Sequence, residues 1–140
     1  MNRYSMPYRI YLKKVRTPAP GSLKGDIDFI CQSFGYFSQR DKNNTAGKIF
    51  RLLVKNISEG DGLTSDQIAE ELELSRGAIV YHLNNFITAG LVIKEKNKYR
   101  LRSHSLQKSI EEIRQDTHRI FNEMLKIAEA IDEELGNFYR

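Results

Sequence analysis

The alternation of apolar and polar positions between Thr64 and Gly90 predicts two short helices joined by a tight turn. Thr64 with Gln67 three residues later is a capping-box pattern, which marks the start of the first helix. Ser75 is a suitable N-cap for the second helix, and Gly90 suits the position just beyond its end. Between these caps the apolar residues recur at the helical period, in the order Ile68, Ala69, Leu72, Ile79, Leu83 and Phe86. This spacing is typical of a helix-turn-helix.

The period of the pattern changes to two after Gly90. Apolar residues alternate with basic ones on both sides of a turn predicted at Glu95-Lys96-Asn97. Two short strands joined by a tight turn, with charged edges, are therefore predicted. The apolar and basic sets are Leu91, Ile93, Tyr99 and Leu101, and Lys94, Lys98, Arg100 and Arg102.

Two more helices are predicted before the helix-turn-helix. Over Asp26–Phe37 the apolar residues fall at i, i+3, i+4 and i+7, with acidic residues in the first turn. Over Asn44–Ile57 a second apolar face recurs, with Asn44 as a candidate N-cap. The two apolar faces consist of Ile27, Ile30, Cys31 and Phe34, and of Ala46, Ile49, Phe50, Leu53, Val54 and Ile57.

One long helix is predicted from Ser103 or Ser105 to Gly136. Its apolar residues alternate in steps of four and three and form a heptad seam with one polar member, Thr117. A stripe of this length exceeds what a compact three-helix core covers, so we expect it to meet a second chain in a homodimer. Folding back onto the Asp26–Phe37 helix is the compatible alternative. The expected dimer interface is Leu106, Ile110, Ile113, Ile120, Met124, Ile127 and Ile131.

Residues 1–25 form a basic arm that contains six basic residues and no acidic one. The alternation of Tyr8, Ile10 and Leu12 predicts a short strand, and residues 17–22 have the composition of a linker. Two roles stay open for this arm. It reaches the phosphates or a minor groove of a nucleic acid, or it packs its tyrosines on the body or on a partner subunit.

The net charge of +4 is unevenly distributed along the chain. The arm carries +6 and residues 74–108 carry +6, whereas residues 26–40, 41–73 and 109–140 carry −1, −3 and −4. Positive charge therefore gathers on the arm, on the second helix of the helix-turn-helix and on the hairpin. This distribution indicates a surface for a polyanion, and lysines that merely solubilise the hairpin are the simpler alternative.

The helix-turn-helix and hairpin resemble the ArsR-like winged-helix transcription regulators, of which MarR-type proteins are close structural relatives. The residues that carry the resemblance are Ser75, Ile79, His82, Leu83, Phe86 and the run Ala89-Gly90-Leu91-Val92. The resemblance implies a dimeric DNA-binding regulator whose second helix enters the major groove while the wing lies along the backbone. Val80 stands where many members carry a polar base-reading residue, and one cysteine cannot supply the paired thiols of the metal-sensing members.

On this interpretation the partner is double-stranded DNA, bound at a pseudo-palindromic site by two recognition helices. The expected contacts of the second helix with the groove are Arg76, Gly77, Tyr81, Asn84 and Asn85. The expected contacts of the wing with the DNA backbone are Lys94, Lys96, Lys98 and Arg100. A winged helix used as a protein-interaction module is one rival, because Val80 and Tyr81 are apolar groups on the recognition helix. RNA binding through the arm is the other, because its tyrosines can stack on bases.

The sequence motifs that mark common enzymes and metal sites are missing. It contains no nucleotide-binding glycine motif, no His-Glu-x-x-His and no Gly-x-Ser-x-Gly. His82, His104 and His118 are too far apart to share a metal within one chain. Cys31 falls on an apolar helix face, where a thiol is normally inert. We therefore expect no catalytic residues, no metal and no cofactor.

At 140 residues the chain is long enough for one domain with extensions. The expected fold is mainly α with a small β-wing: a basic arm (1–25), an additional helix and loop (26–43), a winged helix-turn-helix (44–102) and a long dimerisation helix (103–140). No apolar run approaches the length of a membrane span, and the N-terminus lacks the apolar core of a signal peptide. A cytoplasmic protein without membrane contact is therefore expected.

Overall fold

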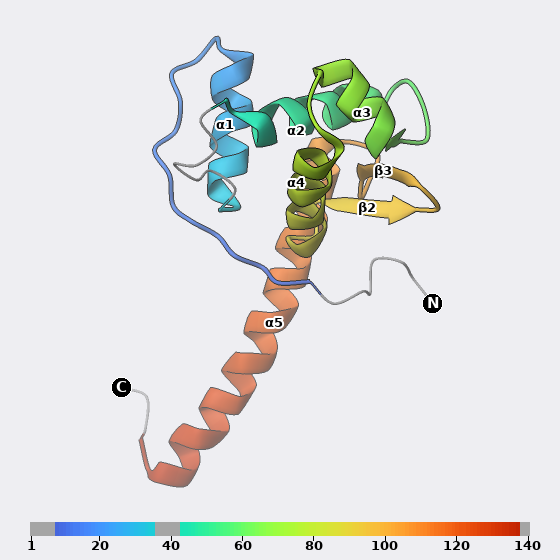
Figure 1. Cartoon of the computed structure of the whole chain (residues 1–140). Helices are drawn as coiled ribbons and strands as arrows, with labels where there is room; N and C mark the ends of the chain where they lie inside the picture. Colours follow the sequence, from blue (N-terminus) through green and yellow to red (C-terminus); the bar gives the residue numbers. More distant parts are fainter. Residues whose placement is uncertain (1–7, 36–42, 138–140) are drawn as a thin grey trace.

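The computed structural model describes residues 8–35 and 43–137, and it confirms the predicted fold class (Figure 1). Four helices and a small sheet form the body, and a fifth, long helix projects from it. The first helix ends at Ser33, with Phe34 as its C-cap, so its predicted extension over Phe34 is wrong, and residues 36–37 lie outside the described residues. The elements are α1 (Leu23–Ser33), α2 (Thr45–Asn56), β1 (Leu63–Thr64), α3 (Ser65–Leu72), α4 (Arg76–Thr88), β2 (Val92–Glu95), β3 (Lys98–Leu101) and α5 (Leu106–Leu135).

The caps that define the helix-turn-helix lie where the sequence predicts them. The Thr64 hydroxyl accepts a hydrogen bond from the Gln67 amide, and the Gln67 side chain accepts one from the Thr64 amide. Ser75 caps α4 by accepting from the Ala78 amide at 3.3 Å. Gly90 follows α4 with φ +84°, a left-handed conformation that favours glycine. Local hydrogen bonds thus fix both helices and the sharp exit toward the wing.

The core of the body lies between α2, α4 and the sheet. The rings of Phe50 on α2 and Phe86 on α4 are tilted, with centroids 5.3 Å apart, and both are fully buried. Ile79 and Leu83 turn inward on the same face of α4. Cys31 of α1 is buried in this core as predicted, which agrees with a structural and not a reactive thiol.

The wing is an antiparallel hairpin of β2 and β3, and β1 pairs with the other edge of β3. The register sets Val92 opposite Leu101 and Lys94 opposite Tyr99. Tyr99 and Leu101 are buried, so the period of two is confirmed for β3. In β2 the predicted face is wrong, because Val92 lies opposite Leu101 and is buried, whereas Ile93 lies opposite Arg100 and is only partly buried. The sequence did not predict β1, because its two residues are too few to show an alternation.

Two predicted local details are wrong. Helix α1 begins at Leu23 instead of Asp26, because Ser22 accepts from the Gly25 amide at 3.0 Å and caps the helix earlier. Asn44 precedes α2 but does not cap it through its side chain. Asn44 has φ 55°, and its side-chain Nδ2 donates a hydrogen bond to Asp28 Oδ1 at 3.0 Å, so the side chain points to α1.

The predicted strand at Tyr8–Leu12 is also wrong. These residues of the arm form neither a strand nor a helix. Their backbone bonds instead to helix ends, with the Arg9 amide donating to the Thr88 carbonyl at 2.9 Å and the Lys13 amide to the Ser33 carbonyl at 2.8 Å. The arm thus follows the body past α4 and α1 (Figure 1), which favours packing on the body for the part described.

Tyr8 anchors the arm to α5 through a partly buried polar cluster. The Tyr8 hydroxyl donates to Asp116 and accepts from Arg102 Nη1 at 3.2 Å. Arg102 also bonds Glu112 at 3.1 Å and Asp116 at 3.4 Å, and the residue is only 4% exposed. The Tyr8 ring lies against Gly90, where an added Cβ would come within 2.6 Å of it. The cluster thus joins the arm, the end of the wing and α5.

Burial raises the pKa of Tyr8, and the hydrogen bond to Asp116 adds to this rise, while Arg102 acts in the opposite direction. Burial alone would lower the pKa of Arg102, but the Tyr8 hydrogen bond and the charges of Asp116 and Glu112 outweigh it and raise that pKa. A raised folded-state pKa of Tyr8 means that its stabilising bond is present below the ordinary tyrosine pKa of about 10. This stabilisation is lost as the pH rises through the folded-state pKa.

Tyr8→Phe should lower the free energy of unfolding at neutral pH by about 1 kcal/mol, because Asp116 and Arg102 lose a partly buried partner. Chemical denaturation measures this difference. Tyr11→Phe is the matched control, since it removes a hydroxyl from a ring that is 56% exposed, and it should leave stability unchanged. Equal stability of Tyr8→Phe and the wild type would show that the anchor is not formed.

Candidate nucleic-acid interface

The outward face of α4 is a stripe of four exposed residues spaced at the helical period. Gly77, Tyr81, Asn84 and Thr88 are exposed, whereas Ile79, Leu83 and Phe86 on the other side are buried. Tyr81 is 64% exposed, although it is a large aromatic residue. Since the buried residues fix the rotation of the helix, this stripe is the face of α4 that remains exposed to solvent.

Arg76 and Gly77 lie in the first turn of α4, where backbone amides point outward. Arg76 pairs with Asp66 of α3 at 3.6 Å, but both side chains are more than 70% exposed. Such an exposed pair contributes little energy and leaves the guanidinium available to another anion. The start of a helix also favours negative charge through its dipole.

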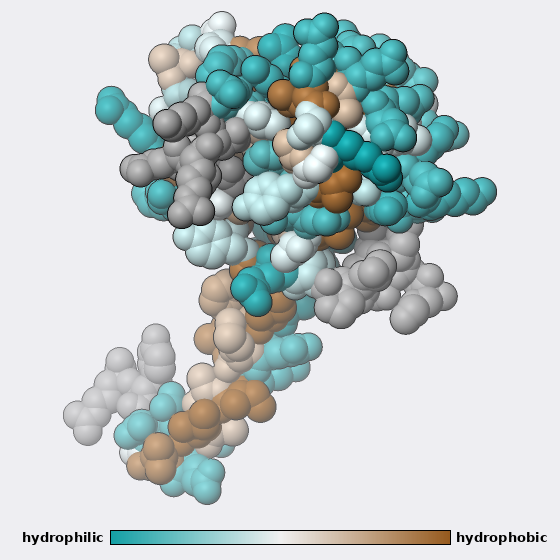
Figure 2. Space-filling view, viewed as in Figure 1, coloured by the Kyte–Doolittle hydropathy of each residue, from teal (hydrophilic) through white to brown (hydrophobic). Residues whose placement is uncertain are grey.

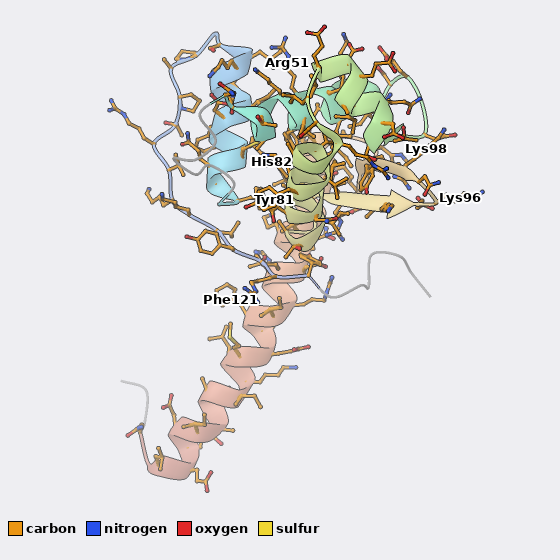
Figure 3. The ribbon with its side chains drawn as sticks, viewed as in Figure 1. Arg51, Tyr81, His82, Lys96, Lys98 and Phe121 are labelled. Atoms are coloured by element: carbon orange, nitrogen blue, oxygen red, sulfur yellow. The ribbon has the colours of Figure 1, made fainter. Side chains whose placement is uncertain are left out.

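Three residues beside the stripe are only half exposed. Val80 and Asn85 flank it, and His82 lies beside Tyr81, with the two rings 5.2 Å apart and edge-on. Figure 3 shows Tyr81 and His82 along α4. Of the predicted groove contacts, Gly77, Tyr81 and Asn84 share the outward stripe, Arg76 lies beside its start, and Asn85 lies at its edge.

The wing carries its free cations at the tip. Lys96 and Lys98 are exposed and lie at the outer end of the hairpin (Figure 3). Lys96 occupies the turn with φ 58°, and Lys94 lies over the Tyr99 ring at 5.3 Å from its centroid. Arg100 bonds Glu95 at 2.6 Å and is partly buried, so it is less available than the lysines. The four predicted wing residues therefore differ in how available their charges are to a partner.

A groove of about 390 Å³ separates α4 from the arm and from the end of α1. Arg9 and Tyr11 of the arm line one side, and Tyr81, His82 and Asn85 of α4 line the other. The sequence predicts the positive charge of the arm but not its position beside α4. The position depends on the contact of Tyr8 with Gly90 and Arg102, about which the sequence holds no local signal.

Helix α5 divides the predicted dimer seam into two parts. Ile113 is 2% exposed, and Leu106 and Ile110 pack against the same core, so these three residues serve the chain's own body. Beyond Thr117 the apolar side chains are exposed, and Figure 2 shows them along the projecting part of the helix. The exposed set is Ile120, Phe121, Met124, Leu125, Ile127, Ile131 and Leu135.

Among residues 8–35 and 43–137 no three His, Cys, Asp or Glu side chains lie close enough together to hold a metal ion. Within the same residues no helix combines the length and apolar composition needed to cross a membrane.

Comparison with known proteins supports the winged helix directly. A sequence model of the MarR family matches residues 52–103, a segment that runs from within α2 to the end of the wing. The match does not extend to the arm, to α1 or to α5. Curated proteins and solved structures gave no significant match. The match supports a likeness of this segment to the MarR family, while the resemblance to the ArsR-like proteins stays a prediction. The helix-turn-helix and wing of this chain are thus similar to those of the MarR family.

Proposed function

We propose that this protein is a sequence-specific regulator of transcription that binds double-stranded DNA as a homodimer. The outward stripe of α4 carries the proposal, because it offers exposed polar and aromatic groups on a helix whose opposite face is locked into the core. An α-helix fits the major groove of B-DNA. The protein would act in the cytoplasm and would perform no catalytic step.

Each part of the surface has its own role in the proposal. Asn84 and Tyr81 lie mid-helix, where base edges come within reach, and asparagine pairs with adenine in a bidentate way. Arg76 and Gly77 suit a phosphate at the start of the helix. Lys96 and Lys98 at the wing tip suit the DNA backbone, which carries the same charge at every base step.

The exposed apolar face of α5 supports the homodimer. Seven large apolar side chains follow one another along the projecting helix, and monomeric proteins rarely leave such a continuous stripe in water. The residues from Ile120 onward are the proposed interface, since the earlier seam residues are already covered. Two α5 helices that pair here would set two α4 helices on successive major grooves of a pseudo-palindrome, about 10 base pairs apart.

A protein-interaction module is the second candidate, and the exposure of Tyr81 favours it. An aromatic side chain that is 64% exposed suits the centre of a protein interface as well as a DNA groove. Selection of bound fragments from a random duplex pool, followed by a gel shift against single-stranded RNA, separates the candidates. Enrichment of one duplex motif supports the DNA regulator.

Asn84→Ala should weaken binding to the selected site by about 1–3 kcal/mol and change binding to random duplex little, because one base contact is lost. Titration of both duplexes measures the difference. Thermal stability should stay unchanged, since Asn84 is exposed. A variant in which Arg76, Tyr81 and Asn84 are all changed to alanine provides the decisive case. If it stays folded and dimeric and keeps its full site preference, α4 does not read the bases.

Lys96→Ala and Lys98→Ala should each weaken binding to every duplex alike. Each lost phosphate contact should flatten the plot of log affinity against log salt by about one unit. Arg100→Ala serves as the internal comparison and should flatten the plot less, because Arg100 is already paired with Glu95. A larger effect at Arg100 than at the two lysines would show that the wing is used differently.

Ile120→Asp should give folded monomers. The side chain is 46% exposed in one chain, so aspartate is tolerated there, whereas burying the same carboxylate in an apolar interface costs several kcal/mol. Sedimentation measures the mass, and circular dichroism checks the fold. Asn122→Asp introduces the same charge on the polar side of α5 and should leave the dimer intact. A dimer that survives Ile120→Asp would place the interface elsewhere.

A further inference from the structure

We propose that residues 8–16 of the arm are a third DNA-contacting element, which binds the sugar-phosphate backbone beside α4. The inference rests on the proposed function, because it adds contacts to the same duplex. Three observations carry it: the place where the arm meets α4, the charge of the arm, and the way in which the arm is held.

The arm meets α4 at the end of its outward stripe. The Arg9 amide donates to the carbonyl of Thr88, which is the last residue of that stripe. The exposed Arg9 side chain and Tyr81 line the same groove of about 390 Å³. The Arg9 guanidinium is therefore available at the edge of the surface on which Tyr81 and Asn84 are exposed.

Residues 8–16 carry four cations that lack an ion-pair partner among the described residues. Arg9, Lys13, Lys14 and Arg16 are all exposed, and none of them forms an ion pair with another described residue. Within the described part of the chain, no carboxylate has to be displaced when a phosphate approaches these side chains. Arg100 on the wing, by contrast, must give up Glu95 to make such a contact. These arm cations are thus more readily available to a phosphate than Arg100 of the wing.

The size of a helix in a groove explains why the arm would meet phosphates. A helix with its side chains is about 10–12 Å across, and the major groove is about 12 Å wide. Whatever lies directly alongside a helix in the groove therefore faces the groove wall, which is the sugar-phosphate backbone. Figure 1 shows the wing tip on one side of α4 and the arm leaving on the other. Contacts on both sides would grip both strands.

Residues 8–13 of the arm are also held against the body in the free protein. Two backbone hydrogen bonds hold them, from Arg9 to Thr88 and from Lys13 to Ser33, and Tyr8 is anchored to Arg102 and Asp116. Part of the entropy cost of binding is therefore already met in the free protein.

The same anchor disfavours single-stranded RNA as the ligand of the arm. Base stacking needs exposed aromatic faces. Of the two arm tyrosines that the structure describes, Tyr8 packs against Gly90 and Arg102, which leaves only Tyr11 well exposed.

The test is duplex binding by the full chain with Arg9 and Lys13 changed to alanine together. Both side chains are exposed, so the fold should be kept. Two lost phosphate contacts should flatten the salt plot by about two units and weaken binding about tenfold per contact at 0.1 M salt. The selected site and random duplex should be weakened by the same factor. Lys48→Ala with Lys55→Ala is the matched control, because it removes two exposed cations from α2, and it should leave the salt plot nearly unchanged.

A second measurement tests the position of the arm without DNA. The amides of Arg9 and Lys13 should exchange with solvent slowly in the wild type, and Tyr8→Ala should speed the exchange at Arg9. Fast exchange of the Arg9 amide in the wild type would overturn the docked arm, even if the double variant loses affinity.

The outcomes separate this inference from the proposed function. If the double variant keeps wild-type affinity and salt dependence while Asn84→Ala loses site preference, the arm inference fails and the DNA regulator stands. If the double variant loses affinity for single-stranded RNA but not for duplex, the arm serves RNA and the inference also fails. If the wild type prefers no duplex, the proposed function falls and takes the arm inference with it.

Discussion

The structure depends on the burial of one face of α4 against α2 and the sheet. Phe86 stacks at a tilt on Phe50, and Ile79 and Leu83 complete a contact that excludes water. Truncating a buried phenylalanine of this kind typically costs about 3–5 kcal/mol, a large share of a domain's stability. This contact fixes how α4 is rotated about its axis. It therefore decides that Gly77, Tyr81, Asn84 and Thr88 face outward, and the proposed DNA-reading surface follows from the core.

A second constraint connects the winged helix to the projecting helix α5. Arg102 follows β3 and bonds Glu112 and Asp116 on α5, while Tyr8 joins the same cluster from the arm. A charge as buried as that of Arg102 is tolerated only when it is paired on several sides. Wing, arm and α5 are therefore held to one another at a single point. In a dimer formed through α5, this cluster would set the distance between the two winged helices.

Local signals allowed most of the fold to be predicted from the sequence. The capping box at Thr64, the cap at Ser75 and the end of the helix at Gly90 each depend on a few adjacent residues, and each is confirmed. The failures involve contacts between distant segments. Tyr8–Leu12 alternates like a strand but joins no sheet, and Asn44 occupies the N-cap position of α2 while its side chain bonds Asp28. Likewise, Ile113 continues the heptad seam in sequence but lies in the core of its own chain.

In the proposed complex, two α4 helices, held by paired α5 helices, enter successive major grooves of one duplex. Hydroxyl-radical footprinting of the wild type on its selected duplex tests this claim most directly. The account predicts two protected windows related by the two-fold axis of the site and centred about 10 base pairs apart. A single protected window, or uniform weak protection along the duplex, would contradict it.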